Sequence, residues 1–358
     1  MKRLAGLLVA GLIIVGGTFG SASAAPTTGK TLAERYIVTL KADANPRAVA
    51  AIAGVDPLYV YDAALNGFAA KLNQGQLNAL RRHASVVAIA PDSEIQLDSA
   101  VVSDETSQTP STDTIGISSA ANVTAYVVST GIFAAHTEFG GRAAVAYDAL
   151  GGNGADCNGH GTYTAGVIGG ARYGVAKDVK LRGVRVFDCN GSGTNAGVIS
   201  GINWIANNGV KPGVAHLGFG GAANTTIDSA VVNLVNRGIV VVVPAGSSNA
   251  NACNYSPARV AVAITVGTST INNTKAPFSN YGPCVDVYAP GTNVTAAWIG
   301  SSTATTTQSG TTVSSAYVAG CIAKYLGPNP TATPAQVHSW VIANAQLVGD
   351  IRIFTCPL

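Results

Sequence analysis

The chain has 358 residues, of which 47% are hydrophobic and only 11% are charged. A chain of this length and composition can bury a large core, and it is too apolar to be intrinsically disordered. The net charge of +3 is small and spread along the sequence, so nucleic-acid binding has no electrostatic basis.

The first 24 residues have the pattern of a secretory signal peptide. Lys2 and Arg3 precede an apolar run from Leu4 to Val15, and residues 22–24 read Ala-Ser-Ala, as signal-peptidase sites do. We therefore expect cleavage after Ala24 and a secreted, extracellular protein. An uncleaved membrane anchor is the alternative, although the run is shorter than the ~20 residues that a span requires. No later segment predicts a membrane anchor.

Residues 25–34 are expected to be a linker, and residues 35–98 to form a small α+β module. Its elements alternate in the order strand, helix, strand, strand, helix, strand, which is the order of a ferredoxin-like module. The strands are predicted at 36–40, 58–61, 67–72 and 86–90, and the helices at 46–53 and 75–80. Residues 99–118 are rich in Ser, Thr and Asp without periodicity, which predicts a second linker.

From residue 119 to residue 358 we expect a larger domain, in which apolar strands alternate with helices. Strands that are apolar on both faces predict an α/β fold with a doubly wound parallel sheet, whose site lies at the carboxyl ends of the strands. The strands are predicted at 123–128, 179–186, 214–219 and 239–243, and the helices near 160–169, 194–207, 225–236 and 311–326. Thr333 and Pro334 predict the start of a last helix.

Three segments at these strand ends carry the candidate chemistry. Residues 127–132 read Val-Val-Ser-Thr-Gly-Ile, residues 158–162 read Asn-Gly-His-Gly-Thr, and residues 309–320 read Ser-Gly-Thr-Thr-Val-Ser-Ser-Ala-Tyr-Val-Ala-Gly. In this order they resemble the Asp, His and Ser motifs of the subtilases, the subtilisin-like serine proteases. The resemblance points to the proteinase K and aqualysin branch of that family. It implies a subtilisin-like α/β domain preceded by an inhibitor prodomain at 35–98.

The resemblance also implies that three catalytic positions are replaced. Ser129 stands where the family has the Asp that orients and stabilises the catalytic His, and Thr312 stands where it has the attacking Ser. Ser247 stands where it has the Asn whose amide stabilises the oxyanion, and only His160 is kept. His216 falls on a predicted strand and is expected to be non-catalytic.

These changes predict a large loss of activity. A serine hydroxyl can hold an imidazole but cannot supply a negative charge, and the branched side chain of Thr312 is bulkier and stiffer than serine. In subtilisin itself, the known reference case, loss of the nucleophile costs about 10⁶ in turnover and loss of the Asp about 10⁴. We therefore expect a pseudoprotease that keeps a peptide-binding groove. The alternative is a weakly active serine-type endopeptidase, with Thr312 as nucleophile and His160 as base.

The groove that the resemblance implies has two edges. One edge corresponds to Asn190, Gly191, Ser192 and Gly193, and the other to Leu217, Gly218, Phe219 and Gly220, where the ring of Phe219 could fill the specificity pocket. Such edges bind peptides in an extended conformation. Loops kept only for folding are the alternative. Without a working triad, the prodomain should stay attached with residues 93–98 in the groove, and it could also inhibit active subtilases.

Six cysteines in an exported chain suggest disulfides. The resemblance implies the pairs Cys157–Cys189 and Cys253–Cys284. It leaves Cys321 and Cys356, which either form a third pair or stay free.

A structural Ca²⁺ site is implied by the resemblance alone, with Asp286 and the carbonyls of Ala261 and Ala263 as ligands. A surface carboxylate at Asp286 is the alternative. We expect no redox or nucleotide cofactor, and a monomer.

Overall fold

The computed structural model describes residues 30–97 and 119–357. The predicted signal peptide and the whole of the predicted second linker lie outside the described residues. Within the described ranges, no helix is both long enough and apolar enough to cross a bilayer.

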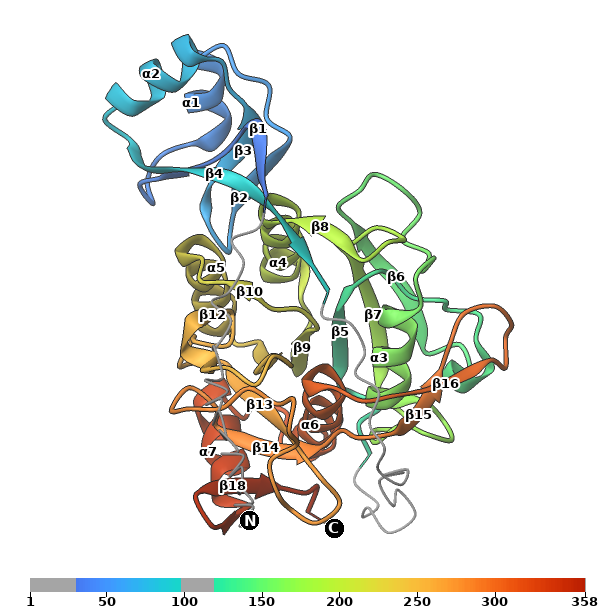
Figure 1. Ribbon diagram of the computed structural model, residues 1–358. Coiled ribbons are helices and arrows are strands. Elements are labelled where there is room, and N and C mark those ends of the chain that lie inside the picture. Colours follow the sequence, from blue (N-terminus) through green and yellow to red (C-terminus); the bar gives the residue numbers. More distant parts are fainter. Residues whose placement is uncertain (1–29, 98–118, 358) are drawn as a thin grey trace, which may run out of the picture.

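The first unit is a four-stranded antiparallel sheet with two helices packed on one face (Figure 1). Its elements are β1 (Thr31–Leu40), α1 (Pro46–Ile52), β2 (Tyr59–Asp62), β3 (Asn66–Lys71), α2 (Gln74–Arg82) and β4 (Val86–Gln96). Asn45 caps α1, and Asn73 forms a capping box with Gln76 at α2, so local sequence sets where both helices begin. The observed order of strands and helices confirms the predicted order, although β1 begins inside the expected linker at residues 25–34.

The larger unit is built on a nine-stranded sheet in the order β17-β18-β14-β13-β11-β9-β5-β7-β6. Neighbouring strands are parallel except for the hairpin at one edge. This confirms the predicted doubly wound α/β fold. The strands of this sheet are β5 (Thr124–Ser129), β6 (Ala143–Asp148), β7 (Lys180–Arg185), β9 (Gly213–Leu217), β11 (Val240–Pro244), β13 (Ile264–Ser269), β14 (Val287–Pro290), β17 (Ala345–Val348) and β18 (Ile351–Phe354).

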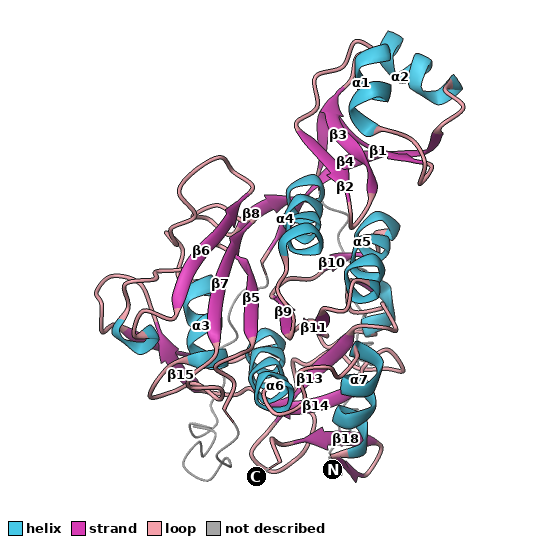
Figure 2. Cartoon of the chain, turned by 180° about the vertical axis from the view of Figure 1, so that it is seen from behind, coloured by secondary structure: helices cyan, strands magenta, loops and turns pink. Residues whose placement is uncertain are grey.

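Helices cover both faces of this sheet (Figure 2). Buried residues of α4 and α5 pack in one core layer, and those of α3, α6 and α7 pack in the other. The helices are α3 (His160–Gly169), α4 (Asn195–Asn208), α5 (Thr225–Asn236), α6 (Thr311–Leu326) and α7 (Pro334–Ala343). Short elements complete the unit: β8 (Ser192–Thr194), β10 (Gly221–Ala222), β12 (Tyr255–Ser256), β15 (Val294–Ala297), β16 (Thr305–Gln308), and the 3₁₀ turns Thr137–Phe139 and Ala252–Asn254.

The first unit rests on α4 of the larger one. The hydroxyl of Tyr61 donates to the carbonyl of Ala196 at 2.9 Å. The backbone N–H of Ala196 donates to the carboxylate of Asp92 at 3.0 Å, and Arg35 pairs with that carboxylate at 2.9 Å. Strand β4 then continues past this contact and reaches β8 of the larger unit.

Three disulfides lie within the larger unit. They join Cys157 to Cys189, Cys253 to Cys284 and Cys321 to Cys356. All six cysteines of the chain are therefore paired, and the third bridge ties the C-terminal segment to α6.

Candidate active site

His160 and Ser129 meet at the carboxyl end of β5. Ser129 is the last residue of β5 and is fully buried, and His160 is the first residue of α3. The Oγ of Ser129 lies 2.7 Å from the Nδ1 of His160. Burial lowers the pKa of His160 to about 4, and the nearby carboxylate of Asp156 only partly opposes that shift. The ring is therefore neutral at pH 7, with an uncharged partner on Nδ1.

Asp156 does not replace the missing carboxylate, because its oxygens serve the start of α3. Its Oδ1 accepts from the hydroxyl of Thr130 and from the backbone N–H groups of Asn158 and Gly159. Its Oδ2 accepts from the backbone N–H and the hydroxyl of Thr162. This carboxylate is a helix cap.

The nucleophile position is not hydrogen-bonded to the catalytic His position. Thr312 is the second residue of α6, as its resemblance to the attacking Ser requires. Among the described residues, however, no hydrogen bond joins the hydroxyl of Thr312 to His160. A general base must reach the proton it removes, so this arrangement is not poised for attack.

The hydroxyl of Ser247 is turned toward Thr311. It lies 3.2 Å from the Oγ1 of Thr311 and accepts from the backbone N–H of Thr311 at 3.3 Å. The same Oγ1 accepts from the backbone N–H of Gly246 at 3.1 Å. Ser247 thus closes the turn before α6 and does not reproduce the side-chain amide of an oxyanion hole.

His216 is the residue whose place in the site the sequence did not reveal. Its ring is fully buried on β9, and its Nε2 lies 2.8 Å from the Oγ of Ser315. Because that hydroxyl donates to the carbonyl of Thr312 at 3.0 Å, it accepts from an N–H on Nε2, which leaves Nδ1 without a proton. Burial, with His160 as a near neighbour, lowers the pKa of His216 to about 3.

The first groove edge is paired with the chain's own β4. Glu94, Ile95 and Gln96 pair antiparallel with β8, and the backbone N–H of Leu97 donates to the carbonyl of Gly191 at 3.0 Å. The predicted edge residues Asn190, Gly191, Ser192 and Gly193 therefore lie together beside this strand. The end of the first unit fills the edge as an added β-strand.

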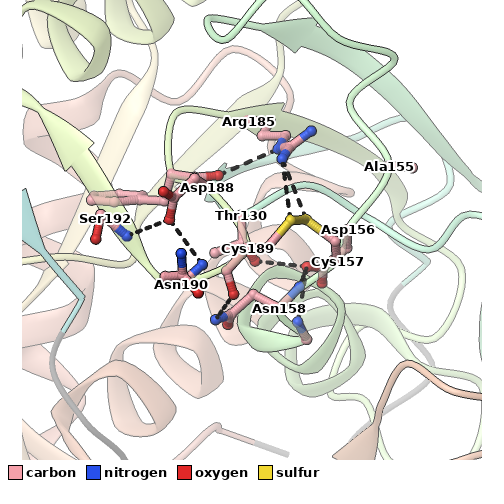
Figure 3. The surroundings of a disulfide bond; sticks show 12 residues. Thr130, Ala155, Asp156, Cys157, Asn158, Arg185, Asp188, Cys189, Asn190 and Ser192 are labelled. Atoms are coloured by element: carbon pink, nitrogen blue, oxygen red, sulfur yellow. Dashed lines mark hydrogen bonds between the residues drawn. A yellow bond between two sulfur atoms is a disulfide. The ribbon is translucent and has the colours of Figure 1, made fainter.

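Figure 3 shows how that edge is held. The carboxylate of Asp188 accepts from the backbone N–H groups of Asn190 and Ser192, at 2.8 and 2.9 Å. The disulfide between Cys157 and Cys189 then ties the edge to the loop that leads into His160. The edge and the His are thus fixed to each other.

The second edge has a buried ring and little side-chain bulk. Phe219 is fully buried and packs on Phe187, with ring centroids 5.7 Å apart, so it lies in the core layer. Leu217 is buried, whereas a Cβ on Gly220 would meet no atom within 4 Å. The side chain of Ile95 reaches this edge at the next residue, Gly221, where a Cβ would lie 3.2 Å from its Cδ1.

The residues around Asp286 do not fit a calcium ion. Calcium takes six to eight oxygen ligands, so its carboxylates must be free to bind. Here the Oδ2 of Asp286 accepts from the backbone N–H of Thr265 at 2.8 Å, and Oδ1 lies 3.1 Å from the Nε2 of His338. Ala261 and Ala263 lie in the turn just before β13. Among the described residues, no group of three or more His, Cys, Asp or Glu side chains could hold a metal ion.

Comparison with known families agrees with this geometry. Residues 127–354 match the model of the subtilase family, and residues 35–98 match that of the peptidase inhibitor I9 family. A solved structure described as a cold adapted subtilisin-like serine proteinase superposes with a TM-score of 0.65 at 41% identity. The superposition covers 69% of this chain and 97% of the chain in that structure.

Curated relatives extend the same result. An extracellular serine proteinase of Thermus sp. (strain Rt41A) is 49% identical over 78% of this chain and 71% of its own length. An alkaline proteinase of Hapsidospora chrysogena is 35% identical over 90% of this chain and 88% of its own. Alkaline serine exoprotease A of Vibrio alginolyticus is 43% identical over 80% of this chain, which spans only 56% of that relative.

Proposed function

Because this chain belongs to the subtilase family and carries an I9 inhibitor prodomain, we propose that it is a secreted pseudoprotease whose peptide groove is held by that prodomain. One observation carries the proposal: a serine hydroxyl, at 2.7 Å, takes the place of the carboxylate on Nδ1 of His160. The imidazolium that forms during acyl transfer would have no counter-charge there. The positions of Ser247 and Thr312 weaken attack further.

The relatives are described as proteinases, so the rival is a slow endopeptidase with Thr312 as nucleophile and His160 as base. A fluorogenic peptide assay on the full chain separates the two. We expect no hydrolysis by the native chain and none by His160→Ala. Hydrolysis that the native chain shows and His160→Ala lacks would refute the pseudoprotease.

Restoration provides the positive control. The combined variant Ser129→Asp, Ser247→Asn, Thr312→Ser replaces each altered position with the family residue. Active subtilases cut their own prodomain junction, so we expect this variant to release the prodomain while the native chain stays continuous. Intact mass spectrometry measures the difference. A native chain that starts near residue 99, made without other proteases, would contradict the proposal.

The proposed partners are extended peptides and active subtilases. The prodomain reaches the groove through backbone pairing and places one apolar side chain, Ile95, at the far edge. Backbone pairing is largely independent of the partner's sequence, so the same segment could bind related enzymes. Residues 35–98, added to an active subtilase, should inhibit it at micromolar concentration. No inhibition there would remove this role.

Secretion is supported by the disulfides, which persist in oxidising compartments, and by a relative described as extracellular.

A further inference from the structure

The disulfide between Cys157 and Cys189 differs from the other two in its exposure. Both of its cysteines are exposed, whereas each of the other two bridges joins cysteines that are buried or half-buried. A thiolate must reach a sulfur atom before it can break a disulfide, and exposed disulfides are the labile ones. Access therefore favours thiol–disulfide exchange at this bridge over the other two.

A guanidinium group lies against both sulfur atoms of this bridge. The Nη2 of Arg185 lies 3.3 Å from the Sγ of Cys157 and 3.9 Å from the Sγ of Cys189 (Figure 3). Its other nitrogens are fixed, because Nη1 pairs with Asp148 at 3.4 Å and Nε donates to the carbonyl of Phe187 at 3.3 Å. A cation beside a sulfur stabilises the thiolate that leaves when the S–S bond breaks. Since Arg185 is nearer to Cys157, it favours Cys157 as the leaving group.

The carboxylates around the bridge are occupied by backbone N–H groups. Asp156 caps the start of α3, and Asp188 accepts from two N–H groups of the groove edge. Asp148, the partner of Arg185, also accepts from two N–H groups of the loop that follows β6. These hydrogen bonds offset the negative charge of the three carboxylates, so the guanidinium remains the charged group in contact with the sulfurs.

The bridge joins the first groove edge to the loop before His160, and the end of the prodomain lies on that edge. The backbone N–H of Leu97 donates to the carbonyl of Gly191 at 3.0 Å. A Cβ on Gly191 would lie 3.5 Å from the Cδ1 of Leu97 and 3.8 Å from the Nδ2 of Asn158. That Nδ2 donates to the carbonyl of Cys189 at 3.0 Å. If the S–S bond breaks, this hydrogen bond replaces a covalent link between the edge and the loop.

We propose that the Cys157–Cys189 bridge exchanges with a small dithiol, and that its reduction loosens the prodomain from the groove edge. A thiolate of the dithiol attacks the Sγ of Cys189, and the S–S electron pair leaves on the Sγ of Cys157 beside Arg185. The second thiol then displaces Cys189 from the mixed disulfide. The chain gains two electrons and two protons as two thiols, and the dithiol becomes a cyclic disulfide. The loosening requires only that the prodomain holds the groove, as in the proposed function, and it does not depend on whether the chain hydrolyses peptides.

Reduction of the full chain with dithiothreitol, followed by alkylation and peptide mass spectrometry, tests the exchange. We expect Cys157 and Cys189 to be labelled first, while the other four cysteines stay oxidised. Arg185→Gln should slow this labelling by about 3-fold to 10-fold, and Arg185→Lys, which keeps the charge, should slow it less. Arg182→Gln, on the same strand, is the control and should react as the native chain does. Native protein that is labelled first at another bridge, or at all six cysteines together, would overturn the proposal.

Hydrogen exchange measures the hold of the groove edge on the prodomain. The double variant Cys157→Ser, Cys189→Ser lacks the bridge without any reductant. We expect the backbone amides of residues 94–97 to exchange about 10-fold faster in this variant than in the native chain. The amides of β3, inside the sheet of the prodomain, should be unchanged. Unchanged exchange at residues 94–97, or faster exchange over the whole prodomain, would each refute the coupling between bridge and groove.

Discussion

Ser129 orients the ring of His160 by a hydrogen bond but supplies no negative charge beside it. A single substitution at Ser129 tests this. We predict that Ser129→Asp raises the pKa of His160 from about 4 by roughly 1–3 units, because an opposite charge within hydrogen-bond distance stabilises the imidazolium. NMR titration of the His160 ring measures the shift. Ser129→Asn is the matched control, since it offers a hydrogen bond but no charge. An equal rise in both variants would show that charge is not what is missing.

At the scale of single residues, the sequence predicts where the site residues lie but not which contacts their side chains make. Ser129, His160, Ser247 and Thr312 stand where the motifs predicted them. The turn of Ser247 toward Thr311 could not be predicted, because it depends on a side-chain rotamer. The sequence predicts His216 to be non-catalytic because it falls on a strand, and its relation to His160 exists only once β9 lies beside β5.

At the scale of elements, Asn203 on helix α4 helps to hold the prodomain. Its Oδ1 accepts from the backbone N–H groups of Asp62, Ala63 and Ala64, at 3.1, 2.9 and 3.0 Å. We predict that Asn203→Ala weakens prodomain docking by about 1–3 kcal/mol, since partly buried donors lose their acceptor. Hydrogen exchange of residues 62–64 should speed up.

The control for this prediction lies on the same helix. Among the described residues, the side chain of Asn208 bonds only to the carbonyl of Trp204, so Asn208→Ala should leave exchange in the prodomain unchanged. Equal exchange rates in the Asn203→Ala variant and the native chain would contradict the role of Asn203.

Helix α7 is tied to the sheet by a titratable pair. The hydrogen bond to Asp286 raises the pKa of His338 above its ordinary value of 6.5, against the opposing effect of burial. A raised folded-state pKa means that the pair stabilises fully below pH 6.5 and is lost as pH rises through the higher value. We predict that the native chain exceeds His338→Gln in free energy of unfolding more at about pH 5.5 than at about pH 9. Urea denaturation measures both.

Asp286→Asn checks the same pair from its other side, because it keeps an acceptor and removes the charge. The pH dependence of the free energy of unfolding of this variant should match that of His338→Gln. Added calcium should stabilise the native chain no more than this variant. A larger calcium effect in the native chain would make Asp286 a calcium ligand after all.

The helices were predictable, whereas several strands of the large sheet, among them β6 and β13, were not. Helices α3, α5 and α6 have the predicted bounds. Asn224 caps the start of α5, whereas α3 and α6 are buried nearly all round and are marked by their motifs. Strands β14 and β18 have only four residues each and gain their identity from neighbours in the sheet. Strand β4 extends six residues past its prediction, because Pro91 and Ser93 still pair with β1 and residues 94–96 pair with β8.

For the whole molecule, the two units should hold together without a covalent link. Strand pairing, the buried Tyr61 and the contact of Asp92 with Ala196 all act across the interface. We predict that a chain cut at a protease site inserted within residues 99–118 elutes from gel filtration as one species. Ile95→Asp should separate the fragments, because it places a charge at a buried position that faces Gly221. Val87→Asp, exposed on the same strand and outside the pairing with β8, is the control and should co-elute. Fragments that separate in the otherwise native chain would show that the connection, and not the interface, keeps the groove occupied.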